Sequence, residues 1–236
     1  MVIKYEFIGK AIYFPKEKIV AISDLHIGYE DSLSSQGIFI PRRQFEETMK
    51  DLKQTFTKTS KVNEVVIVGD LKHEFGTITS QEWRETRKVL DFLREKVGRV
   101  ILVKGNHDKI LEPIAEREEM EIKDHHTTGS ICFVHGDRLV IECLDKDVKI
   151  IVAGHRHPAI VLGDKYKTER YKCFLVGKYK KKQVVILPSF FPFIEGSEIS
   201  NIENNKMFIS EKKLKDFEVF VVGDEVYKFG KIKEII

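Results

Sequence analysis

The sequence predicts a mixed α/β fold, because short apolar runs of strand type alternate along the chain with amphipathic helical segments. Its composition is that of a globular protein, with 42% hydrophobic and 33% charged residues among 236. A chain of this length is ordinary for one large α/β domain. We therefore expect a single domain over residues 1–236.

Five apolar runs of four or five residues, rich in β-branched side chains, predict buried strands. They cover residues 18–22, 65–68, 100–103, 131–134 and 150–153. Apart from Lys18, each run is continuously apolar rather than alternating, so we expect each strand to be covered on both faces.

Two segments between these runs carry apolar residues at helical spacing. In the first, they are Phe45, Met49, Leu52 and Phe56. This period predicts an amphipathic helix over about 41–59. A second helix is expected to begin after Thr79, where Glu82 completes a capping box, and to end before Gly98.

Strand signals dominate from about residue 158 onward. Apolar runs on both sides of the lysine-rich segment 178–182 predict a hairpin with an exposed tip. Contact of this tip with a phosphate backbone is the less favoured alternative. The runs 217–222 and 226–229 predict a final strand pair. The aromatic loop 188–193 is expected to belong to the core, with a pocket wall or a dimer contact as alternatives.

The cysteines and the overall charge exclude some classes of protein. Cys132, Cys143 and Cys173 are an odd number without paired spacing, so we expect reduced, mostly buried thiols rather than a disulfide or a zinc knuckle. The net charge of +3 is too small to indicate a nucleic-acid partner by itself. The apolar runs are too short to cross a bilayer, and the N-terminus lacks the pattern of a secretion signal. A cytoplasmic protein without a membrane partner is expected.

A short polar cluster follows each of the five buried runs. The clusters are Asp24-Leu25-His26, Gly69-Asp70 with His73, Gly105-Asn106-His107-Asp108, His135-Gly136-Asp137 and Gly154-His155-Arg156-His157. Loops beyond buried strands can converge at one sheet edge from distant points in the chain. Carboxylate, amide oxygen and imidazole are ligands that suit two divalent first-row metals. Two metals held close together can split phosphate esters.

Each cluster alone also has a plain structural interpretation. Asp24 and His26 could lie in a surface turn, and Gly69-Asp70 or His135-Gly136-Asp137 could be ordinary strand-to-loop turns. Asp108 could be a helix N-cap. The ordered set is more specific than its parts, because it contains six of the eight histidines: His26, His73, His107, His135, His155 and His157.

The ordered set resembles the motif pattern of the calcineurin-like binuclear metallophosphoesterases. Their pattern is D-x-H, G-D-x-x-[DH], G-N-H-[DE], H-G-[DH] and G-H-x-H, and it covers residues 24–157 here. The resemblance implies a four-layer α-β-β-α sandwich of two mixed β-sheets flanked by helices. It also places two metals at the C-terminal edges of the strands.

The resemblance further implies a ligand set for these metals. The first metal would be bound by Asp24, His26 and His157. The second would be bound by Asn106, His135 and His155. Asp70 would bridge the two, and a carboxylate between two dications also reduces their mutual repulsion. Mn²⁺ is the expected metal, with Fe, Zn and Ni as alternatives.

The implied reaction is the hydrolysis of phosphodiester bonds by a hydroxide activated between the two metals. His107 is the expected proton donor to the leaving oxygen. Asp108 is expected either to orient that imidazole or to act as a helix N-cap. His73 would contact a phosphate oxygen.

The residues after Asp70 favour a phosphodiesterase over a phosphoprotein phosphatase. Such phosphatases carry Asp-Arg-Gly at this point, whereas Leu71-Lys72-His73 stands here. His73 makes the chain similar to the SbcD-like repair nucleases and to small archaeal phosphoesterases related to them. Lys72 differs from the residue that is common at this position in that branch. Whether this protein binds DNA tightly or has an ATPase partner is therefore left open. We expect a nuclease for DNA or RNA, with a phosphodiesterase for a cyclic-nucleotide-like molecule, or a non-catalytic scaffold, as alternatives.

Overall fold

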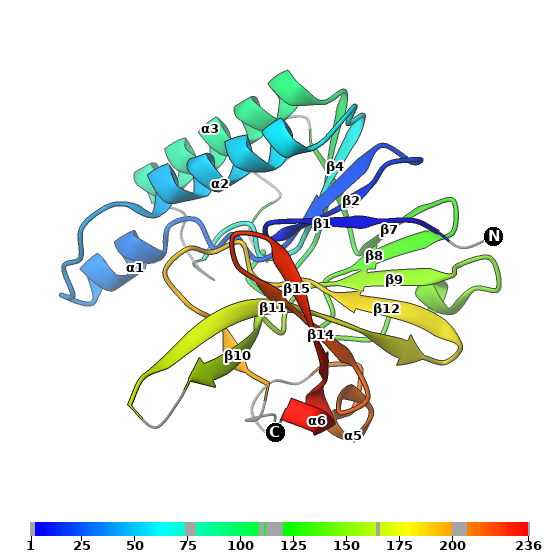
Figure 1. Ribbon diagram of the computed structural model, residues 1–236. Coiled ribbons are helices and arrows are strands. Elements are labelled where there is room, and N and C mark those ends of the chain that lie inside the picture. The colour runs from blue at the N-terminus through cyan, green and yellow to red at the C-terminus, as the bar shows by residue number, and fades with distance from the viewer. Residues whose placement is uncertain are drawn as a thin grey trace.

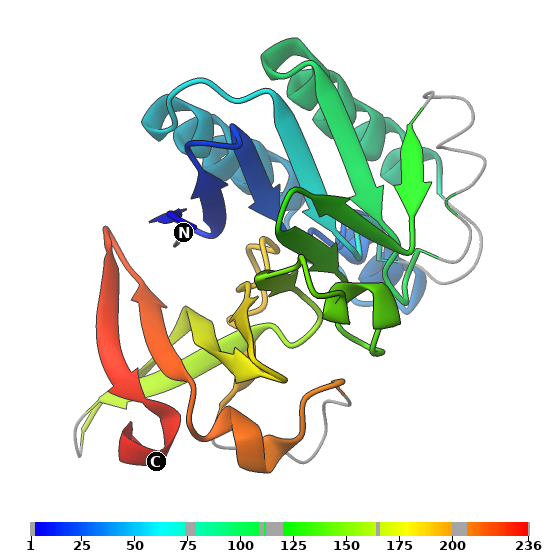
Figure 2. The same ribbon diagram turned by 90° about the vertical axis from the view of Figure 1, so that its right-hand side faces the viewer.

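The computed structural model describes residues 3–73, 79–108, 111, 120–163, 166–199 and 207–235. Within them, two mixed β-sheets pack face to face, and helices lie on their outer sides (Figure 1; Figure 2). The predicted four-layer sandwich is confirmed, although its two helical layers differ in thickness.

The first sheet has the order β1-β2-β3-β4-β5-β6. Its strands are β1 (Glu6–Ile8), β2 (Ala11–Phe14), β3 (Ile19–Ile22), β4 (Glu64–Val68), β5 (Arg99–Val103) and β6 (Glu121–Lys123). The first three strands are antiparallel, and β3 to β6 are parallel neighbours. The C-terminal ends of β3, β4 and β5 therefore lie together at one edge.

The second sheet has the order β13-β10-β11-β12-β9-β8-β7, and β14 and β15 extend it from β11. Its first strands in chain order are β7 (His125–Thr128), β8 (Ile131–Val134), β9 (Ile150–Ala153), β10 (Pro158–Gly163) and β11 (Thr168–Tyr179). The others are β12 (Lys182–Ile186), β13 (Ser197–Glu198), β14 (Glu218–Val222) and β15 (Val226–Lys231). Because β8, β9 and β12 are parallel, the ends of β8 and β9 also share one edge.

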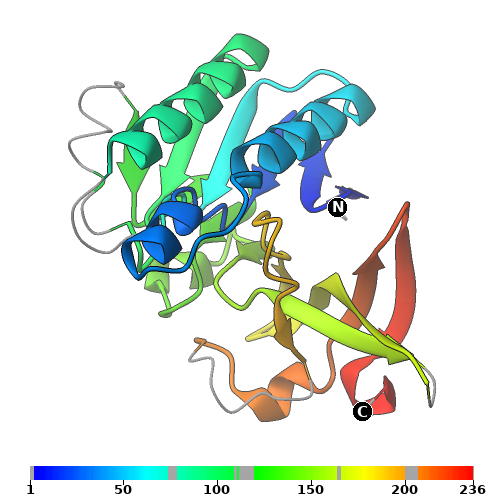
Figure 3. The same ribbon diagram turned by 90° about the vertical axis from the view of Figure 1, so that its left-hand side faces the viewer.

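The helices cover the two outer faces unequally. The longer helices α2 (Gln44–Lys58) and α3 (Ser80–Lys96) lie side by side over the first sheet, and α1 (Tyr29–Ser35) precedes them (Figure 3). The outer face of the second sheet carries the four-residue helices α5 (Glu211–Leu214) and α6 (Ile232–Ile235) and the 3₁₀ helix Ile141–Leu144. In the described part of the chain, no helix is both long enough and apolar enough to traverse a bilayer.

Three apolar clusters fill the spaces between the four layers. Successive residues of a strand point to opposite faces, so Val20 and Ile22 of β3 face the helices, whereas Ile19 and Ala21 face the second sheet. A third cluster, which includes Phe217, lies under the outer face of the second sheet. The central strands are thus covered on both faces, and the residues that follow them are held rigidly.

The predicted strands and both long helices are confirmed, with small shifts at their ends. Helix α2 begins at Gln44 rather than near residue 41. The Glu30 carboxylate accepts hydrogen bonds from the N–H groups of Arg43 and Gln44, at 2.6 and 3.0 Å, and so caps the helix from α1. The spacing of apolar residues in the sequence does not reveal a cap that comes from another helix.

The lysine-rich segment forms the predicted hairpin tip between β11 and β12. Lys180 and Lys181 both have a left-handed backbone, as a two-residue hairpin turn requires. Lys182 is buried instead, and its ammonium donates to the carbonyl oxygens of Asp145 and Val148. Because β12 runs parallel to β9, the tip lies at the edge opposite to the ends of β8 and β9.

The aromatic loop 188–193 is core for most of its length, as expected. Phe190 and Phe191 are 0% and 1% exposed. Phe193 is 37% exposed at the end of the loop. The core interpretation is therefore confirmed for the first two rings and does not describe the third.

The prediction of three reduced cysteines is wrong. Cys132 of β8 and Cys143 of the 3₁₀ helix form a disulfide, with Cα atoms 5.4 Å apart. The chain between them turns back over the outer face of the second sheet, so both side chains enter the same apolar cluster. Sequence spacing does not reveal such a return of the chain. Cys173 is a buried free thiol, as expected.

Thr79 supplies a testable contribution to stability at the start of α3. Its hydroxyl accepts a hydrogen bond from Glu82 N–H at 3.0 Å and donates one to the Asp31 carboxylate of α1 at 2.6 Å. Thr79→Ala should lower the free energy of unfolding by about 1 kcal/mol, measured by urea denaturation, because it removes the N-cap. Thr79→Ser keeps the hydroxyl and should lose much less. An unchanged urea midpoint in the alanine variant would contradict this role.

Candidate metal centre

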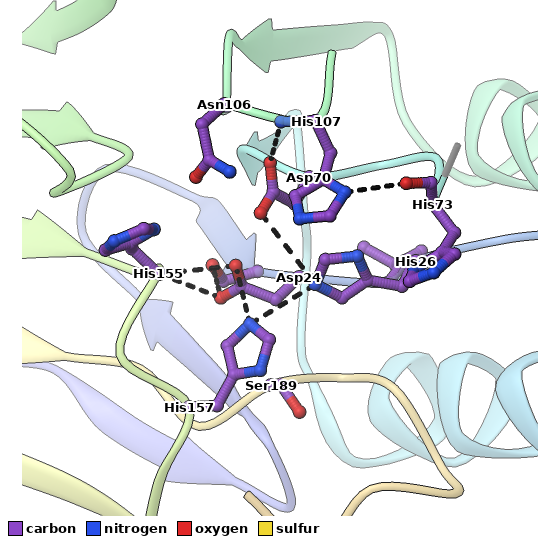
Figure 4. A network of polar contacts seen from close by, with 12 residues as sticks. Asp24, His26, Asp70, His73, Asn106, His107, His155, His157 and Ser189 are labelled. Carbon is purple, nitrogen blue, oxygen red and sulfur yellow. Dashed lines mark hydrogen bonds and ion pairs between the residues drawn. The ribbon is translucent and has the colours of Figure 1, made fainter. Parts of the chain in front are cut away.

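The five polar clusters meet in one place, between the C-terminal edges of the two sheets. Figure 4 shows this place and labels residues of every cluster except that of His135. The first sheet contributes residues that follow β3, β4 and β5: Asp24, His26, Asp70 and Asn106. The second sheet contributes residues that follow β8 and β9: His135, His155 and His157. The structure thus brings together all seven residues that the sequence proposes as ligands.

The backbone at this place has an unusual conformation. Positive φ angles of 47° to 69° occur at five of the seven residues: Asp24, His26, Asp70, His155 and His157. Eight non-glycine residues in the described ranges have such angles, so the site holds most of them. The left-handed region costs a non-glycine residue on the order of 1 kcal/mol or more. The surrounding structure therefore holds these loops in a geometry that they would not adopt by themselves.

The first group of side chains consists of Asp24, His26, Asp70 and His157, whose ligand atoms lie within 4.8 Å of one another. Nε2 of His157 is 3.1 Å from Oδ1 of Asp24 and 3.3 Å from Nε2 of His26. Nε2 of His26 is 3.8 Å from Oδ2 of Asp70. Two atoms bound to one cation at about 2.1 Å lie roughly 3.0–3.5 Å apart, so these separations are close to those of a metal site.

The second group consists of Asp70, His135 and His155, again within 4.8 Å. Nε2 of His135 lies 3.4 Å from Oδ2 of Asp70 and 3.1 Å from Nδ1 of His155. It also lies 3.0 Å from Oδ1 of Asn106. Asp70 is common to both groups, which is the arrangement expected of a bridging carboxylate.

The orientation of the imidazoles fits metal ligands better than ordinary core histidines. Nδ1 of His135 donates to the carbonyl oxygen of Val68 at 3.2 Å, which leaves the lone pair of Nε2 facing the group. Two such lone pairs at about 3 Å repel unless a proton or a cation lies between them. The donor set of imidazole, carboxylate and amide oxygen therefore fits two divalent metals.

Two motif glycines are required by close approach. A Cβ on Gly69 would lie 2.0 Å from Nδ1 of His135. A Cβ on Gly105 would lie 2.2 Å from Oδ1 of Asp70. Neither contact is sterically allowed, so glycine at these positions lets the two ligands reach the centre.

Burial and mutual charge shift the titration of the site. Burial, together with the His157 ring, lowers the pKa of His26 to about 3, so this imidazole is neutral at pH 7. Burial would raise the pKa of Asp24, but the neighbouring rings of His157, His135 and His26 hold it below its ordinary value. Burial would likewise lower the pKa of His135, but the hydrogen bond and charge of Asp70 raise it to about 10. A proton on His135 thus balances carboxylates that a cation would otherwise neutralise.

A third group lies beside the first two and contains His26, His73 and His107. Nδ1 of His107 donates to the carbonyl oxygen of His73 at 2.6 Å, which orients the ring and leaves Nε2 as the nitrogen for proton transfer. The backbone N–H of His107 donates to Oδ1 of Asp70 at 2.9 Å. His107 therefore lies beside the shared carboxylate, and its role as the proton donor stays a prediction.

Asp108 supports the site in a different way from the one expected. Its buried carboxylate accepts hydrogen bonds from the N–H groups of Leu71 and Gly105, at 3.1 and 2.9 Å. It joins the loop after β4 to the loop after β5, whereas the carbonyl of His73 orients His107. Burial and the Asp70 charge raise the pKa of Asp108 to about 6. Residues 109 and 110 lie outside the described residues, so a helix N-cap at Asp108 stays a prediction.

Several supporting residues carry no signal in the sequence. Nε2 of Gln44 donates to the carbonyl oxygen of His26 at 2.6 Å and so supports the strained backbone of that residue. The ring centroid of Phe191 is 5.9 Å from that of His26, and the centroid of Tyr29 is 4.9 Å from that of His73. These contacts join segments far apart in the chain, so residue spacing does not predict them.

Comparison with known proteins gives one family and a set of similar folds. The family model described as calcineurin-like phosphoesterase matches residues 17–137, or 121 of the 236 residues. No curated protein matches the sequence. The nuclease MPE of Pseudomonas putida has a similar structure, with 22% identity and a TM-score of 0.63 over 94% of this chain and 93% of that one.

Two weaker structural matches have TM-scores too low to support an argument. Vps29 of Chaetomium thermophilum is 20% identical, with a TM-score of 0.38 over 72% of this chain and 70% of its own. A predicted phosphoesterase of Streptococcus pneumoniae is 17% identical, with a TM-score of 0.34 over 90% of this chain and 97% of its own.

The family model itself spans four of the five polar clusters, including the shared Asp70 and the proton-donor candidate His107. The chain belongs to the calcineurin-like phosphoesterase family.

Proposed function

We propose that the protein is a metal-dependent phosphodiesterase that acts on nucleic acid. The observation that carries the proposal is the pair of ligand groups that share Asp70, with His107 directly beside that carboxylate. Two divalent cations bound there would supply an acidified water and positive charge against the phosphoryl oxygens. A leaving alkoxide then needs a proton, which a neighbouring acid must donate.

The residues of this chain divide the remaining work among them. Asp70 would contribute its carboxylate to both cations, because it belongs to both ligand groups. The His107 ring, fixed through Nδ1 by the carbonyl of His73, would donate the Nε2 proton of its imidazolium form to the leaving oxygen and keep the proton on Nδ1. Because the hydrogen bond fixes the orientation of the ring, little reorganisation is needed at this step.

The choice of a phosphodiester over a phosphomonoester rests on His73. An arginine directly after the bridging aspartate would grip a phosphomonoester dianion. This chain has Leu71 at that position and His73 two residues further on. The Pseudomonas putida protein with the similar structure is a nuclease, which makes nucleic acid the first substrate class to test. The lysine-rich hairpin tip does not support a nucleic-acid substrate, because it lies at the sheet edge opposite to the candidate metal centre. A small nucleotide stays the alternative.

Mn²⁺ is the metal that we propose, with Fe, Zn and Ni as alternatives. The amide oxygen of Asn106 and the carboxylates of Asp24 and Asp70 are hard ligands, and the imidazoles are borderline ones. Mn²⁺ and Fe²⁺ accept both kinds of ligand, whereas an all-sulfur site would favour softer metals. The complete ligand groups also argue against a non-catalytic scaffold. The cytoplasmic location stays a prediction.

Substitutions at His107 and Asp70 should separate proton donation from metal binding. His107→Asn should retain about two Mn²⁺ per chain and lose about 10²–10⁴-fold in turnover of thymidylyl-thymidine, whose alkoxide needs a proton. It should lose much less on bis-p-nitrophenyl phosphate, since nitrophenolate leaves without one. Asp70→Asn should lose both metal and turnover on either substrate.

The matched control for these variants is His125→Asn, on β7 outside the site. It should keep the metal content and both rates of the unaltered protein. Equal losses of His107→Asn on the two substrates would remove its role as the acid. A metal-loaded protein that is inert to every phosphodiester would favour the scaffold.

Metal binding should release protons, because the metal-free site holds one on His135. The pKa of about 10 keeps this imidazole protonated at pH 7, whereas a metal needs its lone pair. We expect release of about one proton or more on Mn²⁺ binding, and an apparent affinity that falls about tenfold per displaced proton for each pH unit of acidification. Calorimetric titrations in two buffers of different ionisation enthalpy measure this release. Equal heats in the two buffers would contradict the expectation.

A further inference from the structure

We propose that an aromatic arc beside His107 binds the base of the leaving nucleoside. The arc consists of Tyr29, at the start of α1, and Phe191 and Phe193, in the loop after β12. The inference rests on the proposed phosphodiesterase function and adds to it the part of the substrate that the protein selects. It depends on where these rings lie and on how they are held.

The rings of the arc lead in an unbroken series to the proton donor. The centroids of Phe193 and Phe191 are 6.2 Å apart, and those of Phe191 and Tyr29 are 4.9 Å apart. Tyr29 meets the ring of His73 edge to face at 4.9 Å. His73 stacks on His107 at 5.5 Å with an interplanar angle of 29°. The series therefore runs from the arc through His73 to His107, the candidate proton donor to the leaving oxygen.

The arc offers ring surface as well as support. Phe193 is 37% exposed and Tyr29 is half-buried, whereas Phe191 is buried at 1% exposure and packs behind them. Phe193 is followed by Ile194, which is 39% exposed. Two large apolar residues at the surface beside a catalytic centre are typical of a binding site.

The loop that carries Phe191 and Phe193 is anchored to the metal centre. The N–H of Phe191 donates to the carbonyl oxygen of Asp24 at 3.0 Å, and the N–H of Phe190 donates to that of Ser23 at 2.8 Å. The Lys172 ammonium donates to both the carbonyl and the hydroxyl of Ser189, at 2.9 and 3.0 Å. The backbone at Phe191 is thus held in place before a substrate arrives, which lowers the entropic cost of binding.

The chemistry of the arc selects flat, uncharged groups. Its three side chains carry no formal charge, and the Tyr29 hydroxyl is their one group that can donate a hydrogen bond to a phosphate. Every nucleobase has a π face, and stacking on aromatic side chains tolerates any base sequence. A leaving nucleoside brings such a base close to the oxygen that His107 protonates. A leaving group without an aromatic base gains nothing from the arc.

The test compares two substrates for the Mn²⁺-loaded protein. One is thymidylyl-thymidine, and the other is the analogue whose leaving nucleoside has an abasic tetrahydrofuran ring in place of the deoxyribose and base. The readout is the ratio of kcat/KM for the intact substrate to that for the abasic one. We expect a ratio of about ten or more for the unaltered protein, from the strength of base stacking. Tyr29→Ala and Phe193→Ala should each bring the ratio down several-fold.

Two further variants keep the test free of folding effects. Tyr29→Phe retains the ring and should retain the ratio, because stacking does not need the hydroxyl. Phe229→Ala removes a comparably exposed ring from β15, 45% exposed, and should not change the ratio. A packing role for the arc would slow both substrates equally and leave the ratio unchanged.

The outcomes separate the inference from the function on which it rests. A ratio near one in the unaltered protein, or a ratio that Tyr29→Ala and Phe193→Ala leave unchanged, overturns the base-binding arc while phosphodiester hydrolysis stands. Failure to hydrolyse either substrate overturns the proposed function and the arc together. A ratio that falls in both alanine variants and survives in Tyr29→Phe supports the arc.

Discussion

The Asp70 carboxylate lies between two groups of imidazoles, and the rest of the structure serves to hold it there. A buried carboxylate next to converging nitrogen lone pairs is costly unless positive charge is supplied. Without a metal, a proton on His135 supplies that charge, since Asp70 raises the pKa of this histidine to about 10. Two divalent cations would satisfy both groups more completely, because each group then receives a charge of its own. The convergence of these side chains is therefore explained by their need for positive charge.

The fold bears the energetic cost of this arrangement. Five ligand candidates have a left-handed backbone, and the approach of His135 and Asp70 to neighbouring loops excludes a side chain at Gly69 and Gly105. Such strain persists only where the surroundings fix the chain on both sides. The buried strands do this, because apolar clusters cover both faces of each central strand and leave the loops beyond them little freedom. Gln44 and Asp108 add hydrogen bonds to the backbone of the same loops.

The sequence predicts the strands and the meeting of the clusters for one reason. A run that is apolar on every residue must be covered on both faces, and parallel strands of this kind deliver their following residues to a common edge. Contacts between segments distant in sequence leave no such pattern. The disulfide between Cys132 and Cys143, the cap that Glu30 gives to α2, and the backbone contacts of Asp108 all arise when the chain returns to an earlier element. The odd number of cysteines even pointed away from a disulfide.

The candidate metal ligands and the proposed aromatic arc come from different parts of the chain. The ligand candidates follow rigid strands, where a shift of a few tenths of an ångström would disturb a metal. The aromatic arc comes from the start of α1 and from the loop after β12, outside the five polar clusters. Loops attached to a fixed scaffold can change their side chains without disturbing the scaffold. Tyr29 joins the two parts, because its ring touches His73, whose carbonyl orients His107. A base that stacks on Tyr29 would therefore lie next to the group that completes the reaction, so selection and proton transfer would act on the same end of the substrate.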